Sequence, residues 1–73
     1  MNIQALQEIL KQEGFRSDYY DLEGGLLPER LTLGQEGDRW CVYYSERGLQ
    51  SDKRYFDSED AACDYFLTQM RRA

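Results

Sequence analysis

The chain has 73 residues, of which 41% are hydrophobic and 14% aromatic, and its 14 acidic and 9 basic residues give a formal net charge of −5. A chain this short forms one small domain, residues 1–73, with little material for a deep, water-excluding pocket, so the size disfavours an enzyme. The aromatic content disfavours disorder, and the acidic balance disfavours binding to phosphate backbones or anionic lipid.

Residues 2–13 have the pattern of an amphipathic helix. The apolar stripe consists of Ile3, Leu6, Ile9 and Leu10. Gly14 follows directly, at a position where a glycine in the left-handed conformation commonly ends a helix. The sequence therefore predicts a helix that packs one face on the core.

Residues 16–29 have no steady hydrophobic period. The segment is rich in carboxylates, its one basic residue, Arg16, lies at its edge, and Gly24-Gly25 and Pro28 interrupt it. We expect a long loop here, and a loop of this length in so small a domain is either functional or partly mobile.

From Arg30 the hydrophobic period becomes two. Leu31 and Leu33 face one way, and a turn over residues 34–38 follows. In the next strand, Trp40, Val42 and Tyr44 alternate with Cys41, Tyr43 and Ser45. Gly48 marks another turn, and residues 53–56 form a short third strand. Short strands joined by short turns predict an antiparallel meander.

A second helix is expected to start at Asp57 or Ser58, either of which can cap it, and the acids that follow suit the positive end of the helix dipole. Its apolar stripe consists of Ala62, Cys63, Phe66, Leu67 and Met70. The predicted fold is α+β: helix, three-stranded antiparallel meander, helix, with both helices on one face of the sheet.

Ser45, Glu46 and Arg47 could suggest a reactive serine. A nucleophilic serine needs a base within hydrogen-bond reach, but the chain has no histidine and both lysines lie in exposed contexts. Polar residues followed by Gly48 suit a turn at the end of a strand. We interpret this stretch as structural and expect no enzymatic activity.

The sequence indicates no metal or cofactor site. Cys41 and Cys63 are too few for a disulfide framework or a four-ligand zinc site, and both are expected to be buried thiols. The acids at 18, 21 and 23 lack EF-hand spacing, and Gly24-Gly25 precedes Leu-Leu-Pro rather than the residues of a phosphate loop.

The predicted element order also occurs in double-stranded-RNA-binding domains. Such a domain needs a basic start to its second helix, whereas this chain has Asp-Ser-Glu-Asp at 57–60. We therefore expect no nucleic-acid binding. No stretch has the length of a signal peptide core or of a membrane span, so a cytoplasmic, reduced protein without membrane contact is expected.

Two surfaces are candidates for binding a partner. The first is the acidic aromatic loop with Asp18, Tyr19, Tyr20, Asp21 and Glu23, and the second is the sheet face with Tyr43 and the adjacent Glu46. Tyrosines supply rigid contact area, and carboxylates attract a partner's basic residues. The alternatives are a loop that packs its tyrosines on its own sheet and a sheet face that is merely solvated.

Three stretches carry a resemblance to a known class of proteins: Y-D-L-E-G-G-L-L-P at 20–28, W-C-V-Y-Y-S-E-R-G at 40–48 and Y-F-D-S-E-D-A-A-C-D-Y-F at 55–66. Together with the opening helix, they resemble small immunity proteins encoded beside toxins in bacterial polymorphic-toxin and secretion systems. The resemblance implies a non-enzymatic inhibitor that acts in interbacterial competition. It suggests, more weakly, a cognate toxin of the NAD-consuming glycohydrolase class.

The expected function is therefore that of an immunity protein, monomeric when free, which occludes the active site of a basic cognate toxin with the acidic loop and the sheet surface. The alternative is a self-associating module that forms a homodimer through the aromatic face of the sheet.

Overall fold

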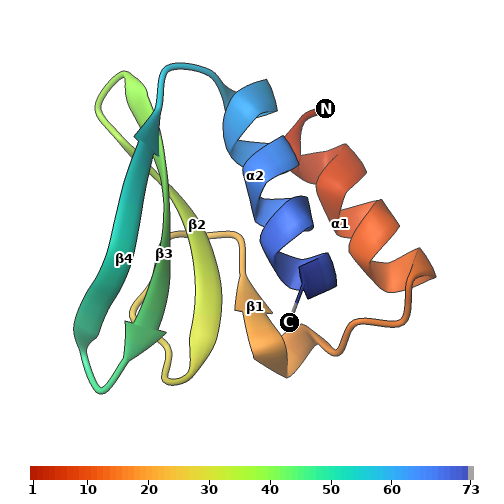
Figure 1. Ribbon diagram of the computed structural model, residues 1–73, viewed down its shortest axis with the longest axis horizontal. Coiled ribbons are helices and arrows are strands. Elements are labelled where there is room, and N and C mark those ends of the chain that lie inside the picture. The colour runs from red at the N-terminus through yellow and green to blue at the C-terminus, as the bar shows by residue number, and fades with distance from the viewer. Residues whose placement is uncertain (73) are drawn as a thin grey trace.

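The computed structural model describes residues 1–72. Along the chain, the elements are α1 (Ile3–Gln12), the 3-10 turn η1 (Ser17–Tyr19), β1 (Tyr20–Asp21), β2 (Arg30–Glu36), β3 (Arg39–Glu46), β4 (Leu49–Phe56) and α2 (Glu59–Arg72). The strands form a single sheet in the order β1-β2-β3-β4, and both helices lie on the same side of it (Figure 1). Neither helix in residues 1–72 is long and apolar enough to cross a membrane.

The predicted three-stranded antiparallel meander is wrong, because the sheet is four-stranded and mixed. β1 pairs in parallel with β2, with Tyr20 opposite Leu31 and Asp21 opposite Thr32. A strand of two residues is too short to show any alternation. It forms because Tyr20 is anchored in the core at 7% exposure, which holds the backbone beside β2.

The hairpins are as expected in kind, but the first turn is shorter than the predicted 34–38, because β2 continues to Glu36 and only residues 37–38 join it to β3. β4 is longer than the predicted 53–56. It begins at Leu49, directly after a two-residue turn in which Arg47 and Gly48 both have positive φ. Between the pairs Val42–Arg54 and Tyr44–Ser51, β3 advances by two residues and β4 by three, so β4 carries a bulge. Asp52 lies at this bulge with a φ of 55°.

Local capping explains where the helices begin and end. The Asn2 side chain accepts a hydrogen bond of 2.8 Å from the amide of Ala5, at the start of α1. After α1, Gly14 has a φ of 81°, and the amide of Phe15 donates back to the carbonyl of Leu10 at 3.0 Å. Ser58, one of the two predicted caps, accepts from the amide of Ala61 at 3.1 Å and starts α2.

The two helices lie side by side and run in the same direction (Figure 1). At their first turns, the amide of Ile3 donates to the Glu59 carboxylate at 2.8 Å, and the amino terminus pairs with Asp60. At their last turns, the Arg71 Nε donates to the Glu13 carboxylate at 3.0 Å. Both ends of α1 are therefore attached to α2.

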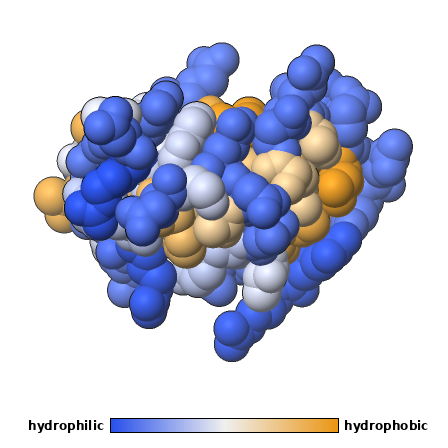
Figure 2. Space-filling model, turned by 90° about the horizontal axis from the view of Figure 1, so that it is seen from above, coloured by the Kyte–Doolittle hydropathy of each residue, from blue (hydrophilic) through white to orange (hydrophobic). Residues whose placement is uncertain are grey.

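The core lies between the helices and the sheet. Its fully buried apolar side chains include Leu6, Leu10, Leu33, Val42, Ala62, Cys63 and Phe66. Viewed along the elements, the outer surfaces of helices and sheet are mostly hydrophilic, and hydrophobic side chains appear in the band between them (Figure 2). This burial is the main source of stability in a domain of this size.

Candidate functional site

The acidic aromatic loop places its two tyrosines in different surroundings. Tyr19 is the last residue of η1 and Tyr20 is the first residue of β1, so the backbone changes from a 3-10 turn to an extended strand between them. Tyr20 is buried in the core at 7% exposure, whereas Tyr19 is 55% exposed. Asp18 is exposed and pairs with Arg16 at 3.1 Å, and the Arg16 guanidinium lies 5.6 Å from the centre of the Tyr19 ring.

Asp21 shapes the loop that follows β1. Its carboxylate accepts hydrogen bonds from the amides of Glu23 at 2.9 Å and Gly25 at 3.1 Å. These bonds fold residues 21–25 into a compact turn, since an aspartate can replace backbone partners in this way. Asp21 is half-buried and Glu23 is exposed, so Glu23 is the carboxylate of this pair that faces solvent.

The glycine pair brings the loop against the sheet face that lies away from the helices (Figure 1). A Cβ atom on Gly24 would lie 3.2 Å from the Cα of Gly34 in β2, so the two backbones touch through their glycines. The Tyr43 hydroxyl donates a 2.7 Å hydrogen bond to the carbonyl of Gly25. The loop thus covers part of the face that sequence reasoning expected to be open.

Tyr43 lies on the predicted side of the sheet but is only 2% exposed. Its neighbour Ser45 is fully buried, and within residues 1–72 its hydroxyl has no hydrogen-bond partner. Glu46, at the end of β3, is exposed. The predicted residues therefore separate into three groups: Asp18, Tyr19, Glu23 and Glu46 face solvent, Asp21 is half-buried and shapes the loop, and Tyr20 and Tyr43 are buried. Their role in partner binding stays a prediction.

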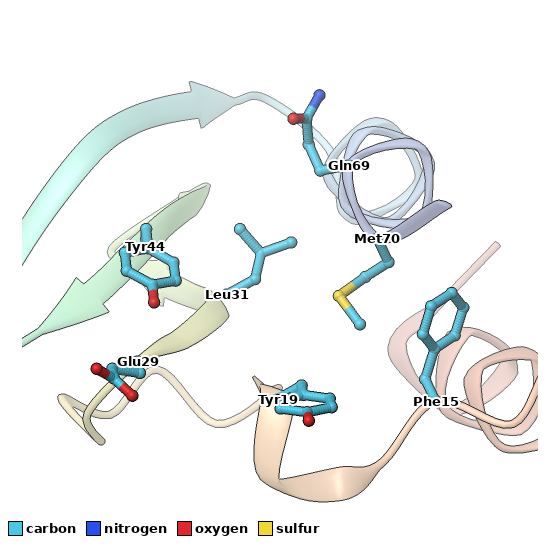
Figure 3. A pocket seen from close by; sticks show the side chains of 7 residues that line it. All are labelled: Phe15, Tyr19, Glu29, Leu31, Tyr44, Gln69 and Met70. Carbon is cyan, nitrogen blue, oxygen red and sulfur yellow. The ribbon is translucent and has the colours of Figure 1, made fainter. Parts of the chain in front are cut away.

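A groove of about 530 Å³ opens at one end of the face that carries the helices. It is lined by Phe15, Tyr19, Glu29, Leu31, Tyr44, Gln69 and Met70. The close view shows Met70 and Leu31 directed into it, Tyr19 forming one wall, and Glu29 at the end beside Tyr44 (Figure 3). Gln69 points away from it.

Exposed apolar side chains gather at this end of the sheet. Leu31 pairs with Tyr44 across β2 and β3, and Leu49 pairs with Glu46 across β3 and β4. Tyr44 and Leu49 therefore lie diagonally on the same face, at 36% and 70% exposure. Tyr19, at 55%, adds a third large side chain. The result is an apolar surface beyond the reach of the helices.

The remaining open part of the far face carries a polar network around Glu36. Lys53 pairs with the Glu36 carboxylate, and the Tyr55 hydroxyl donates to it at 3.1 Å. The hydrogen bond from Lys53 holds the pKa of Glu36 below its ordinary value, although partial desolvation opposes it. The Arg39 guanidinium lies 4.1 Å from the centre of the Tyr55 ring. These side chains satisfy one another, as is typical of a solvated sheet face.

Sequence reasoning missed the groove. Tyr44 was placed correctly on the face of Trp40 and Val42, but that assignment predicts a core residue rather than a groove wall. Met70 was assigned to the apolar stripe of the second helix, and Phe15, just past the first helix, was not considered as a site residue. No local pattern in the sequence signals the groove, because its lining residues are far apart along the chain and meet only in the folded protein.

No group of three or more histidine, cysteine, aspartate or glutamate side chains within residues 1–72 is arranged to hold a metal ion. Comparisons with protein-family models, with curated proteins and with solved structures find no match for the chain.

Proposed function

We propose that the chain is a cytoplasmic immunity protein that binds one cognate bacterial toxin and blocks its active site. The observation that carries this proposal is the exposure of Tyr19, Tyr44 and Leu49 at one end of a small acidic domain. Large apolar side chains that are exposed next to one another are typical of an interaction surface.

The charges beside this surface suit a basic partner. Asp18, Glu29 and Glu46 are exposed near these apolar side chains, and the net charge of −5 would speed association with a basic toxin. Inhibition needs no chemistry from the inhibitor, since a loop or a surface that fills a pocket excludes substrate. The resemblance to immunity proteins favours a toxin, and within toxins an NAD-consuming glycohydrolase.

The test begins with a pull-down from a lysate of the organism that encodes the chain, followed by purification of any stoichiometric partner. Alone, the partner should be toxic when expressed, and an equimolar amount of this chain should abolish its activity, with NAD hydrolysis assayed first. A Tyr19→Ala, Leu49→Ala double variant should lose this inhibition. Gln4→Ala, an exposed change on α1, is the matched control and should retain it.

A partner whose activity is unaffected by the chain would contradict the proposal, as would a chain that recovers no partner. The alternative of a homodimer through the aromatic sheet face is tested by the molecular mass in solution at low micromolar concentration. The burial of Tyr43 leaves that face with less aromatic surface than expected, so the structure adds no support for the homodimer.

A further inference from the structure

Five of the seven side chains that line the groove are apolar or aromatic: Phe15, Tyr19, Leu31, Tyr44 and Met70. At about 530 Å³ the groove falls within the range of small-ligand sites, and it is open to solvent along one side. It is therefore accessible to a side chain that projects from another protein.

Glu29 gives the groove a negative charge at one end. Its φ of 55° is in the left-handed region, which non-glycine residues seldom adopt. Glu29 follows Pro28 in a turn that leads into β2, and a positive φ is a common requirement of such turns. Within residues 1–72, the Glu29 carboxylate takes part in none of the ion pairs.

Two nearby cations are paired with other carboxylates: Arg16 pairs with Asp18, and Arg71 pairs with Glu13. Arg30, next to Glu29 in the sequence, donates to the carbonyl of Ser17 at 3.4 Å, and its buried Nε has no hydrogen-bond partner within residues 1–72. The Glu29 carboxylate is exposed and lies at the end of the groove beside Tyr44 (Figure 3).

We propose that this groove receives an arginine side chain from the partner protein. The inference rests on the proposed function, whose partner is expected to be basic, and it names the residue that is recognised. The aliphatic part of an arginine can lie along Leu31 and Met70, while its guanidinium meets the faces of Tyr19 and Tyr44 and the carboxylate of Glu29.

The charge of Glu29 decides between occupants. An apolar side chain would fill the same walls but would make no ion pair with the exposed Glu29 carboxylate, whereas a cation would add one. A lysine offers a positive charge but no planar group to stack on the tyrosines, so arginine is preferred. The chain already contains one such contact, since the Arg16 guanidinium lies 5.6 Å from the centre of the Tyr19 ring.

The experiment is an NMR titration of the ¹⁵N-labelled chain with blocked tripeptides Gly-X-Gly, in which X is arginine, its neutral isostere citrulline, or norleucine. We expect the arginine peptide to shift amide signals of groove residues and to bind about fivefold more tightly than the citrulline peptide, the size that one cation–π and carboxylate contact supports. Glu29→Gln should reduce arginine binding to the citrulline level. Glu8→Gln, an exposed change of the same charge on α1, should leave it unchanged.

Equal binding of arginine and citrulline, tighter binding of norleucine, or retention of arginine binding by Glu29→Gln would overturn the inference. If the chemical shifts of groove amides change with protein concentration in the absence of peptide, the groove binds a second copy of the chain. That result also overturns the inference. If Glu29→Gln still neutralises a purified toxin partner fully, the groove inference fails and the proposed function stands. If the arginine peptide binds as expected but no toxin partner exists, the proposed function fails alone.

Discussion

The hydroxyl of Tyr43 and the carbonyl of Gly25, eighteen residues apart in sequence, form a 2.7 Å hydrogen bond that fixes the loop after β1 on the sheet. Tyr43→Phe removes this bond and leaves the Gly25 carbonyl without it. We expect the free energy of unfolding to fall by about 1 kcal/mol, the usual net contribution of such a bond. Urea denaturation measures this change in the free energy of unfolding. Hydrogen exchange of the backbone amides in residues 22–29 should also become faster.

The matched control is Tyr55→Phe, since the Tyr55 hydroxyl donates to Glu36 on the exposed part of the same face. Its removal should change stability by less than about 0.5 kcal/mol. Equal losses in the two variants would show that the loop does not depend on the bond to Gly25.

The contact between Gly24 and Gly34 makes a second prediction. A Cβ atom on Gly34 would lie 3.0 Å from the Cα of Gly24, and both sides of this contact are backbone that cannot rotate away. Gly34→Ala should therefore lower the free energy of unfolding by about 1–3 kcal/mol, the cost of overpacking. The amide signals of Gly24 and Gly25 should also shift.

Gln35→Ala, at the next and exposed position of β2, controls for strand propensity and should be nearly neutral. Unchanged loop signals in Gly34→Ala would mean that the loop does not rest on β2 at this point.

The two cysteines should be unreactive in the folded protein. Burial raises the pKa of the Cys63 thiol to about 11, and burial, followed by the charge of Glu36, also raises the pKa of Cys41. At pH 8 both thiols are then protonated, and the protonated thiol is a poor nucleophile. A colorimetric thiol reagent should detect neither in native buffer and both in denaturant.

Leu49→Cys provides the positive control, because position 49 is 70% exposed, and its thiol should react at once. Rapid labelling of either native cysteine would contradict the burial described for it.

The stability of the domain should fall in acid. Hydrogen bonding lowers the pKa of Glu36 through Lys53 and the pKa of Glu13 through Arg71. A carboxyl with a lowered folded pKa stabilises the protein above its ordinary pKa of about 4.5, and this contribution is lost as the pH falls through the folded value. The urea concentration at the midpoint of unfolding should therefore decrease as the pH is lowered below about 4.5.

In Glu36→Gln, part of this acid dependence should disappear, and the difference between pH 7 and pH 3 should be smaller than in the parent. Glu8→Gln, which changes a carboxylate that takes part in none of the ion pairs, should keep the full dependence. Identical pH profiles for Glu36→Gln and the parent would exclude the Lys53 pair as a source of stability.

The parts of the fold that could be predicted are those with long periodic patterns. Both helices, the Gly14 stop, the Ser58 cap and the β2–β3 hairpin follow from apolar spacing and turn residues. Asn2 was expected inside the first helix and instead caps it. β1 could not be predicted, because two residues show no period and their pairing depends on the distant Leu31.

The site was less predictable than the fold. The sequence placed Tyr19 and Tyr20 in the same candidate surface and could not distinguish them, because Tyr19 ends a 3-10 turn and is exposed whereas Tyr20 starts a strand and is buried. The burial of Tyr43 depends on where the Gly24-Gly25 loop lies, which is a long-range contact. The groove is lined by residues from η1, both central strands and α2, so it depends on how these elements pack together.

The attachment of α1 to α2 has a consequence for the order in which the chain folds. Residues 30–72 contain three strands and a helix in which each element contacts its neighbours along the chain, whereas α1 finds Glu59, Asp60 and Arg71 only across separations of 56 to 59 residues. Contacts of long sequence separation form late because closing the loop between them costs entropy. We expect α1 to dock last, so that Glu13→Gln speeds unfolding and hardly changes the folding rate. The newly made chain would then expose the Leu6 and Leu10 side of α1 until α2 has been synthesised.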